Sequence, residues 1–437
     1  MLESVNIFWF RRDLRLQDNA GLYYALKQSR PVLLLFIFDR EILDKLEDRS
    51  DKRVNFIYES VRKINLELEA VGGSLRVEYG VPKDVFKILL QQYSIETVFT
   101  NHDYEPYAIQ RDEGIKDQLA QNYVGFQTHK DQVIFEKKEI VKDDGRPYTV
   151  YTPYSKKWLK NFAEQSYKPF HSEVLLERVF KCPPFAFPSL EHMNFAPGTE
   201  LTVKPEVDKF IIRDYHRTRD FPGIDGTSKM GVHLRFGTIS IRQLVSQTVS
   251  LNEIFLKELI WREFFMQLLW HKPRLESKCY KVEYENINWN NGEDDFDKWC
   301  LGLTGYPIVD AGMRQLNATG FMHNRVRMVV ASFLVKHLLV DWRWGEAYFA
   351  RKLMDYELAS NNGNWQWVAG CGCDAAPYFR IFNPYTQTKK FDGAEEYIKK
   401  WIPEYNTENY PGPIVEHEFA RERCLRVYRE ALSTKYL

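Results

Sequence analysis

The chain has 437 residues, a length that corresponds to about three average domains. Its 60 Lys plus Arg balance 60 Asp plus Glu, and the resulting net charge of +0 argues against a protein that coats nucleic acid through bulk positive charge. With 44% hydrophobic and 27% charged residues, and no apolar run near the ~18 residues that span a bilayer, the composition indicates a soluble globular protein.

The first 125 residues alternate short β-type runs with helical patterns. The predicted strands cover residues 6–10, 31–38, 74–80 and 96–104. The clearest helix spans residues 51–73, where apolar side chains recur with a 3.6-residue period until a Gly-Gly pair ends it. Strands that alternate with helices predict a doubly wound parallel sheet, an α/β domain over residues 1–125.

A ligand site at the end of this sheet is one interpretation of the strand-end residues. No Gly-x-Gly-x-x-Gly follows the first strand, which argues against dinucleotide binding of the Rossmann type. Ligands of open α/β sheets bind beyond the carboxyl ends of the strands, which here places residues 10–12, 38–40 and 101–105 around the site. Ordinary strand-end loops explain the same residues equally well.

Periodicity fades between residues 126 and 205, where prolines cluster and one helix is predicted near residues 153–164. We interpret this stretch as a long interdomain connector. From 206 to 437 the pattern is helical almost throughout, which predicts an all-α second domain. Nine of the 11 tryptophans lie in this half, from Trp261 onward, so the two halves are expected to have different tasks.

The N-terminus and the cysteines bear on the compartment. Charged residues follow the first apolar run directly, which is not the pattern of a secretory signal. Six cysteines are too sparse for a disulfide framework, and the one close pair, Cys371 and Cys373, has neither metal-ligand spacing nor a second pair. We therefore expect free thiols, a cytoplasmic protein and no metal site.

The segment 225–231 opens a helical stretch and combines small residues, two hydroxyls and a lysine. Free N–H groups at a helix N-terminus with a nearby cation are suited to a pyrophosphate. The full Walker spacing is absent, however, and Thr227 or Ser228 acting as an ordinary N-cap explains the segment as well.

Glu258 and Trp261 are three residues apart on one predicted helix and therefore share a face. The surrounding apolar residues would leave the Glu258 carboxyl half-buried, which makes it a candidate proton donor. The alternative is a solvated glutamate beside a core tryptophan.

A basic, aromatic region follows. Residues 311–352 carry seven Lys plus Arg against two acids, and residues 209–242 carry seven against three, beside the tryptophan-rich segments. This combination is expected of a phosphate-lined cleft with stacking rings. Two carboxylates, Asp355 and Glu357, come next; without His or Cys at ligand spacing, a hydrogen-bonding role is favoured over a metal site.

Three motifs are highly specific in combination: TGYPIVDAGMRQL from Thr304, MHNRVRM from Met322 and NNGNWQW from Asn361. Together with WFRRDLRLQDN from Trp9 and RIFNPYTQTKKFD from Arg380, they resemble the photolyase and cryptochrome family over essentially the whole chain. The match is closest to the microbial class I cyclobutane pyrimidine dimer photolyases.

The resemblance implies an α/β antenna domain and a helical domain that holds FAD. The implied activity is light-driven repair of cyclobutane pyrimidine dimers in DNA, by electron transfer from excited reduced FAD to a flipped dimer, in a protein expected to act as a monomer away from membranes. The main alternative is a cryptochrome, a blue-light photoreceptor that signals through a partner. Only about 45 residues follow Asp392, without a long tail, which favours the enzyme.

The resemblance also assigns residues to tasks. Glu258, Asn361 and Met328 would be catalytic, with Glu258 stabilising the dimer anion, Asn361 facing the flavin N5, and Met328 favouring cyclobutane dimers over (6-4) products. The electron carriers would be Trp289, Trp342 and Trp365. FAD would be bound by Tyr215, Thr227, Ser228, Lys229, Met230, Gly231, Asn324, Arg327, Asp355, Glu357 and Asn361, with Arg327 as the partner of Asp355. The dimer and its phosphates would be bound by Arg219, Glu258, Trp261, Asn324, Arg325, Met328, Trp367 and Arg380.

Two departures from the family pattern stand out. Glu357 replaces the more familiar aspartate, and Cys371 and Cys373 occupy positions where small hydroxyl residues are common. A second, light-harvesting chromophore is also implied, with Glu105 as a contact. The sequence does not choose among a folate, a deazaflavin, a flavin or an empty site.

Overall fold

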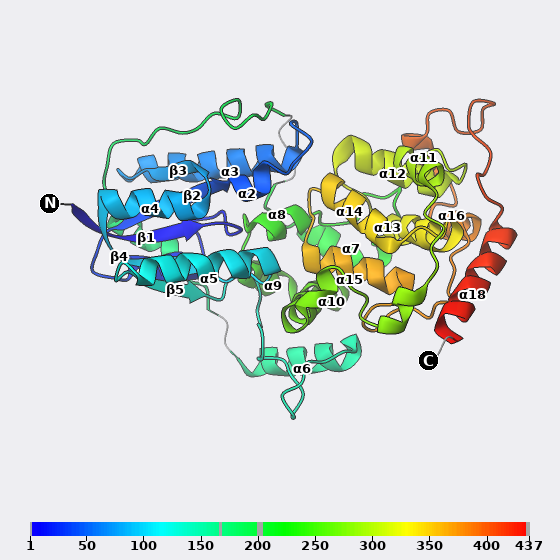
Figure 1. Ribbon diagram of the computed structural model, residues 1–437, viewed down its shortest axis with the longest axis horizontal. Coiled ribbons are helices and arrows are strands. Elements are labelled where there is room, and N and C mark those ends of the chain that lie inside the picture. Colours follow the sequence, from blue (N-terminus) through cyan, green and yellow to red (C-terminus); the bar gives the residue numbers. More distant parts are fainter. Residues whose placement is uncertain (1, 166–167, 199–203, 434–437) are drawn as a thin grey trace. The chain divides into compact units, whose positions relative to one another are not determined.

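The computed structural model describes residues 2–165, 168–198 and 204–433 (Figure 1). Contacts divide the chain into two compact units that are interleaved along the sequence. The sheet unit comprises residues 1–136, 161–207 and 229–247, and the helical unit comprises residues 137–160, 208–228 and 248–437. The sequence predicts three consecutive segments instead, 1–125, 126–205 and 206–437, and these boundaries stay a prediction.

Five parallel strands form the sheet, in the order β3-β2-β1-β4-β5. The strands are β1 (Glu3–Phe10), β2 (Val32–Asp39), β3 (Leu75–Gly80), β4 (Tyr93–Asn101) and β5 (Gly125–His129). The helices of this unit are α1 (Ala20–Leu26), α2 (Arg40–Leu43), α3 (Lys52–Glu69), α4 (Pro82–Gln92), α5 (Pro106–Ala120), the 3-10 helix η1 (Ser172–Arg178), α8 (Gly231–Phe236) and α9 (Ile241–Thr248). The predicted doubly wound α/β fold is therefore confirmed.

Helices cover both faces of this sheet, which is why its central strands are apolar at nearly every position. Trp9 of β1 packs edge-on against Phe86 of α4, with 5.2 Å between the ring centroids, on the face that α5 also covers. On the other face, Phe38 of β2 packs against Tyr58 of α3, with 6.3 Å between the ring centroids. Alternate residues of a strand point to opposite faces, so both sets are buried.

The return segment, residues 229–247, completes the sheet unit from far along the chain. The buried Arg242 guanidinium donates to Asp18 Oδ1 at 3.0 Å and to Asp131 Oδ1 at 2.8 Å. Gly237 has φ +65°, and a Cβ there would lie 2.2 Å from the carbonyl oxygen of Arg12, so only glycine fits. The first 207 residues therefore do not contain all of the unit's internal partners.

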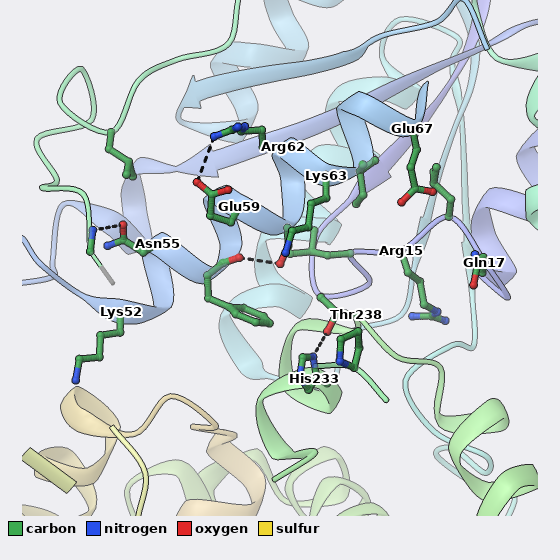
Figure 2. Close-up of a pocket in the computed structure, with 18 of the residues that line it drawn as sticks. Arg15, Gln17, Lys52, Asn55, Glu59, Arg62, Lys63, Glu67, His233 and Thr238 are labelled. Carbon is green, nitrogen blue, oxygen red and sulfur yellow. Dashed lines mark hydrogen bonds and ion pairs between the residues drawn. The ribbon is translucent and has the colours of Figure 1, made fainter. Parts of the chain in front are cut away.

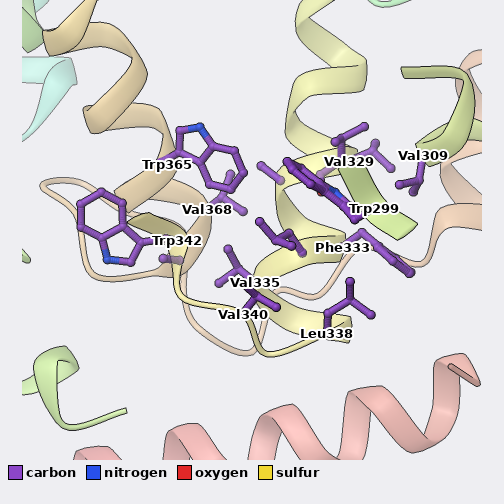
Figure 3. Packing of buried hydrophobic residues seen from close by; sticks show 14 of the residues in the cluster. Trp299, Val309, Val329, Phe333, Val335, Leu338, Val340, Trp342, Trp365 and Val368 are labelled. Atoms are coloured by element: carbon purple, nitrogen blue, oxygen red, sulfur yellow. The ribbon is translucent and has the colours of Figure 1, made fainter. Parts of the chain in front are cut away.

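The helical unit is built around one large apolar cluster, part of which appears in Figure 3. Its helices are α6 (Tyr151–Glu164, of which residues 161–164 group with the sheet unit), α7 (Lys209–Thr218), α10 (Glu253–His271), η2 (Pro273–Glu276), η3 (Val282–Asn286), α11 (Glu293–Leu301), α12 (Pro307–Thr319), α13 (Asn324–Ser332), the π-helical turn η4 (Phe333–His337), α14 (Trp342–Lys352), α15 (Leu358–Ala369), α16 (Pro384–Phe391), α17 (Glu396–Trp401) and α18 (His417–Ser433). The predicted all-α character is confirmed.

Sequence reasoning missed one strand and misjudged one helix start. β5 is short and half-exposed, so its sequence GFQTH carries no apolar run, although it pairs with β4 along five residues. Helix α8 begins at Gly231 with Met230 as its N-cap and no side-chain cap bond, so the N-cap interpretation of Thr227 or Ser228 is wrong. Of the helices described, none is both long and apolar enough to cross a membrane.

Candidate active site

A cavity of about 350 Å³ in the helical unit gathers many of the predicted site residues. Its walls come from α10, α13, α15 and the loop that joins α14 to α15. The predicted residues that line it are Arg219, Glu258, Trp261, Asn324, Arg327, Met328, Asp355, Glu357, Asn361, Trp365 and Trp367. Side chains more than 100 residues apart in sequence thus share one enclosure, as a ligand site requires.

Glu258 and Arg219 form an ion pair at this cavity. Arg219 Nη1 donates to Glu258 Oε1 at 2.5 Å, and about a third of the Glu258 side chain, 32%, is exposed. Burial raises the pKa of Glu258, and this effect outweighs the opposing attraction of Arg219. The carboxyl is therefore better able to hold a proton than an exposed glutamate, which is the property expected of a proton or hydrogen-bond donor.

Trp261 presents a ring that is already stacked on one side. The Tyr151 ring lies 3.6 Å from the Trp261 ring with an interplanar angle of 5°, and the Tyr151 hydroxyl donates to the Lys257 carbonyl at 2.8 Å. Tyr151 begins α6, inside the predicted connector, and sequence reasoning missed it because nothing local connects that helix to α10. The stack fixes the orientation of Trp261 at the cavity wall.

Asn361 is held by a residue that sequence reasoning also missed. Its side-chain nitrogen donates to the Glu346 backbone carbonyl at 3.1 Å and to Glu346 Oε1 at 2.9 Å. Two acceptors on that side fix the amide orientation, so Oδ1 is the group left to accept a hydrogen bond in the cavity. Burial raises the pKa of Glu346, although the bond from Asn361 opposes it.

The carboxylates near the start of α15 have cationic partners. The expected pair of Arg327 and Asp355 is present, with Arg327 Nη2 2.9 Å from Asp355 Oδ2. Glu357, the N-cap residue of α15, is buried, and its Oε2 lies 3.8 Å from Arg262 Nη2. The wall thus offers an amide oxygen, carboxylate acceptors and cationic donors, a set that matches the polar edge of a flavin.

Two of the arginines expected to hold phosphates lie beside the cavity and contact its lining. Arg325 Nη2 donates to Asp220 Oδ1 at 2.7 Å, and its Nη1 lies 3.7 Å from the Met328 sulfur. Arg380 lies 5.8 Å from the centroid of the Trp367 ring. Ion pairs with Asp220 and Glu258 hold Arg325 and Arg219 near the cavity, where an anion could compete for them.

The three predicted electron carriers lie in or against the apolar cluster. Trp365 and Trp342 are buried, and Figure 3 shows both rings beside the valines of that cluster. Trp365 packs so closely on Gly345 of α14 that a Cβ at that position would lie 2.1 Å from its Cη2. Trp289 is half-buried and contacts the Tyr428 ring edge-on at 6.0 Å.

The predicted phosphate-binding positions divide between the two units. Tyr215, Thr227 and Ser228 belong to the helical unit, whereas Lys229, Met230 and Gly231 belong to the sheet unit. Within the helical unit, the Arg219 guanidinium lies over the Tyr215 ring at 5.5 Å. Lys229 has a positive φ of 53°, and the helix α8 starts two residues later.

The strand ends of the sheet unit carry a network of buried ion pairs. Arg12 lies 3.2 Å from Asp103 and 3.1 Å from Glu105, and Arg235 of the return segment also pairs with Glu105. Burial alone would raise the pKa of Asp103, but Arg12 and Arg11 outweigh it and hold this pKa well below its usual range. Sequence reasoning placed a ligand site here without foreseeing that the arginines would neutralise the acids.

The sheet unit also contains a cavity of about 580 Å³ that sequence reasoning did not find. Figure 2 shows Lys52, Arg62 and Lys63 of α3 along it, with Glu59 paired to Arg62. Burial raises the pKa of Glu67 in the same wall. None of the predicted chemistry falls on these residues, so the smaller cavity of the helical unit is the candidate active site.

Comparison with known proteins covers nearly the whole chain. Residues 6–172 match the family model described as DNA photolyase, and residues 255–409 match the FAD binding domain of DNA photolyase. A deoxyribodipyrimidine photo-lyase of Alkalihalophilus pseudofirmus is 35% identical, with 98% of each chain covered.

Two solved structures have the same architecture. A bacterial class III photolyase from Agrobacterium tumefaciens is 32% identical, with a TM-score of 0.86 over 99% of this chain and 98% of that one. An archaeal photolyase from Sulfolobus tokodaii, described with two FAD molecules, is 33% identical, with a TM-score of 0.81 over 98% of this chain and 100% of that one.

Proposed function

The chain belongs to the photolyase and cryptochrome family, and we propose that it is a light-driven lyase that repairs cyclobutane pyrimidine dimers in DNA with FAD as its cofactor. One observation carries the proposal. Stacking tryptophans and a carboxyl of raised pKa, which suit two fused neighbouring bases, line the same cavity as the polar groups that suit a flavin. The relative that is similar over its full length is named as an enzyme of this activity rather than as a photoreceptor.

FAD would be held mainly by Asn361, Asp355, Glu357 and Arg327. When bound, FAD supplies the absorption of light and the electron that splits the dimer. Glu346 positions the Asn361 amide so that its oxygen accepts a hydrogen bond, and the Arg327–Asp355 ion pair holds both side chains at the cavity wall. Glu357 has one more methylene than the familiar aspartate, and its buried carboxylate lies 3.8 Å from Arg262. The phosphates of FAD would be bound by Tyr215 and the stretch from Thr227 to Gly231.

The dimer would enter the cavity by base flipping. A fused dimer stacks and pairs poorly, so extruding it from the duplex costs only a few kcal/mol, and stacking on Trp261 and Trp367 offsets this by ~1–3 kcal/mol per base. Met328 and Asn324 line the same cavity as these rings. Glu258 would donate a hydrogen bond to a dimer carbonyl and so stabilise negative charge that develops there.

Arginines and tryptophans would complete the machinery. Arg219, Arg325 and Arg380 would bind the phosphates that flank the dimer, and Arg219 and Arg325 would exchange their internal carboxylate partners for the backbone of DNA. Trp365, Trp342 and Trp289 would carry electrons that restore the reduced state of the cofactor. The burial of Trp365 and Trp342 excludes water from their rings, which favours transfer between rings over side reactions, whereas Trp289 is half-buried.

The wider setting is part of the same proposal. We expect a monomer that acts in the cytoplasm, a placement supported by six free cysteines, five of them buried. A second, light-harvesting chromophore would bind at the strand ends near Glu105. A fluorescence spectrum of the chromophores released by mild denaturation would distinguish a folate, a deazaflavin and a flavin from an empty site.

The decisive experiment exposes purified protein with reduced flavin to blue light in the presence of a dimer-containing oligothymidylate. Repair is read as recovery of thymine absorbance, and no recovery would refute the activity and favour the photoreceptor alternative. Glu258→Ala should lower the repair yield while FAD stays bound. Glu253→Ala is the matched control, because Glu253 lies on the same helix with 69% of its side chain exposed. Equal yields from the two variants would remove Glu258 from the mechanism.

A further inference from the structure

Two buried cysteines from distant parts of the chain lie together in the helical unit. Cys279 precedes η3 and Cys371 follows α15, and each is 1% exposed. The Lys281 N–H donates to the Cys371 carbonyl at 2.8 Å, so the two backbone segments run side by side. Both residues belong to the cluster of Figure 3, and the proposed repair scheme uses neither.

One guanidinium joins this pair to Trp342. Arg343 Nη2 lies 3.9 Å from the Cys279 sulfur, and the guanidinium carbon lies 4.7 Å from the centroid of the Trp342 ring. The same Nη2 donates to Glu285 at 2.8 Å, and Glu285 also accepts the Cys279 backbone N–H at 2.6 Å. A cation beside a sulfur favours its thiolate, the form that gives up an electron most easily.

The six cysteines are not equivalent. Cys371 lowers the pKa of the Cys279 thiol, and Trp342 and Arg343 act in the same direction, although burial and the Glu285 carboxylate oppose them. Burial raises the pKa of Cys300 to about 12 and those of Cys373 and Cys424 to about 11. Burial raises the pKa of Cys182 and of Cys371 as well. Cys279 is the one thiol whose environment favours ionisation, and a second thiol lies against it.

We infer that Cys279 and Cys371 are an internal dithiol that supplies electrons to photo-oxidised Trp342 and closes to a disulfide. The inference rests on the proposed role of Trp342 as an electron carrier. Cys279 gives one electron to the oxidised indole and loses its proton; the resulting thiyl sulfur bonds to Cys371, whose S–H proton also leaves. The sulfur pair then gives a second electron to Trp342 after a second oxidation.

The balance of this step is two S–H bonds broken, one S–S bond formed, two electrons passed to Trp342 in turn and two protons released. The Glu285 side chain is 29% exposed and accepts the Cys279 backbone N–H, so it would pass the protons to solvent. Two electrons are also what full reduction of a flavin needs, so one dithiol would serve one cofactor.

The test counts thiols in the intact FAD-loaded protein, after denaturation, before and after anaerobic blue light without added reductant. The count should fall from six to four, and peptide mass spectrometry should find Cys279 linked to Cys371. Cys279→Ser and Cys371→Ser should each start with one thiol fewer and lose none in light. Cys424→Ser is the matched control, since it removes a buried thiol outside the pair and should still lose two.

The outcomes separate this inference from the function on which it rests. If Trp342→Phe blocks flavin photoreduction but the native chain keeps six thiols in light, the dithiol donor is refuted and the electron route stands. If Trp342→Phe photoreduces normally, the route through Trp342 is refuted and the dithiol donor with it. A disulfide between any other pair of cysteines would equally overturn the assignment.

Discussion

Removing the Tyr151 ring is expected to lower the affinity for damaged DNA, although Tyr151 is not among the residues proposed to contact the DNA. Tyr151 is stacked on Trp261 at 3.6 Å, is 9% exposed, and is tied to Lys257 by its hydroxyl. Tyr151→Phe keeps the stacked ring and loses only the hydroxyl. Tyr151→Ala loses both, so the pair of variants separates the stack from the hydrogen bond.

The magnitudes follow from these contacts. Loss of the hydroxyl bond should lower the free energy of unfolding by about 1 kcal/mol, and truncation of the buried ring by ~3–5 kcal/mol. A stacked aromatic pair is worth ~0.5–1.5 kcal/mol beyond burial. Without that support Trp261 must be reoriented when the dimer binds, which converts to about a 2- to 12-fold weaker affinity.

The assay is a fluorescence anisotropy titration of a labelled, dimer-containing oligonucleotide in the dark at fixed ionic strength. An undamaged oligonucleotide of the same sequence measures non-specific binding, which both variants should leave unchanged. Tyr151→Phe should bind the dimer as the native protein does. Native affinity in a folded Tyr151→Ala protein would show that Trp261 needs no support from Tyr151 and would refute the reasoning.

Three further predictions concern stability. Burial raises the pKa of Glu258, so ionisation of this carboxyl destabilises the folded chain as the pH rises through that pKa. At pH 7, Glu258→Gln should therefore melt at a higher temperature than the native chain. Below pH 4.5 the difference in melting temperature should disappear. Burial lowers the pKa of Lys336 from 10.5 to about 8, so between these pH values the unfolded chain binds the proton more readily than the folded chain. Relative to Lys336→Met, the native chain should therefore lose stability as the pH falls from 10.5 to about 8, and parallel pH profiles would contradict this. Gly345→Ala should lower the free energy of unfolding, measured in urea, by ~1–3 kcal/mol, because the new Cβ would overlap Trp365. Gly412→Ala is the control and should leave the free energy of unfolding unchanged, because no atom lies within 4 Å of its Cβ.

The elements that sequence predicted well have strong local signals. The strands near NIFWF and PVLLLFIF contain uninterrupted apolar runs, and the helix after residue 51 repeats its apolar face for five turns, so the α/β half could be foreseen. β5 could not, because an edge strand that is half-exposed needs few apolar residues.

The sequence could predict which residues belong to the site, but not the contacts that orient them. Motif resemblance supplied Glu258, Trp261 and Asn361, and the structure places all three on one cavity. The residues that orient them, Tyr151 and Glu346, act through contacts across the fold, and no spacing rule connects α6 to α10 or α14 to α15. Motif resemblance assigned Arg219 to phosphate and was silent on its pairing with Glu258, because a carboxylate 39 residues away leaves no trace near the arginine.

The return segment imposes an order on synthesis. While the ribosome has released only the first 207 residues, the sheet can pair its strands and Arg15 can pair with Asp131, but Asp18 still lacks Arg242 and Asp131 has only one of its two cations. A buried carboxylate without its cation is costly, so the nascent sheet unit stays incomplete until residues 229–247, which carry Arg242, have been synthesised. A fragment that ends at residue 207 would lack residues 229–247 permanently, so its sheet unit would stay incomplete.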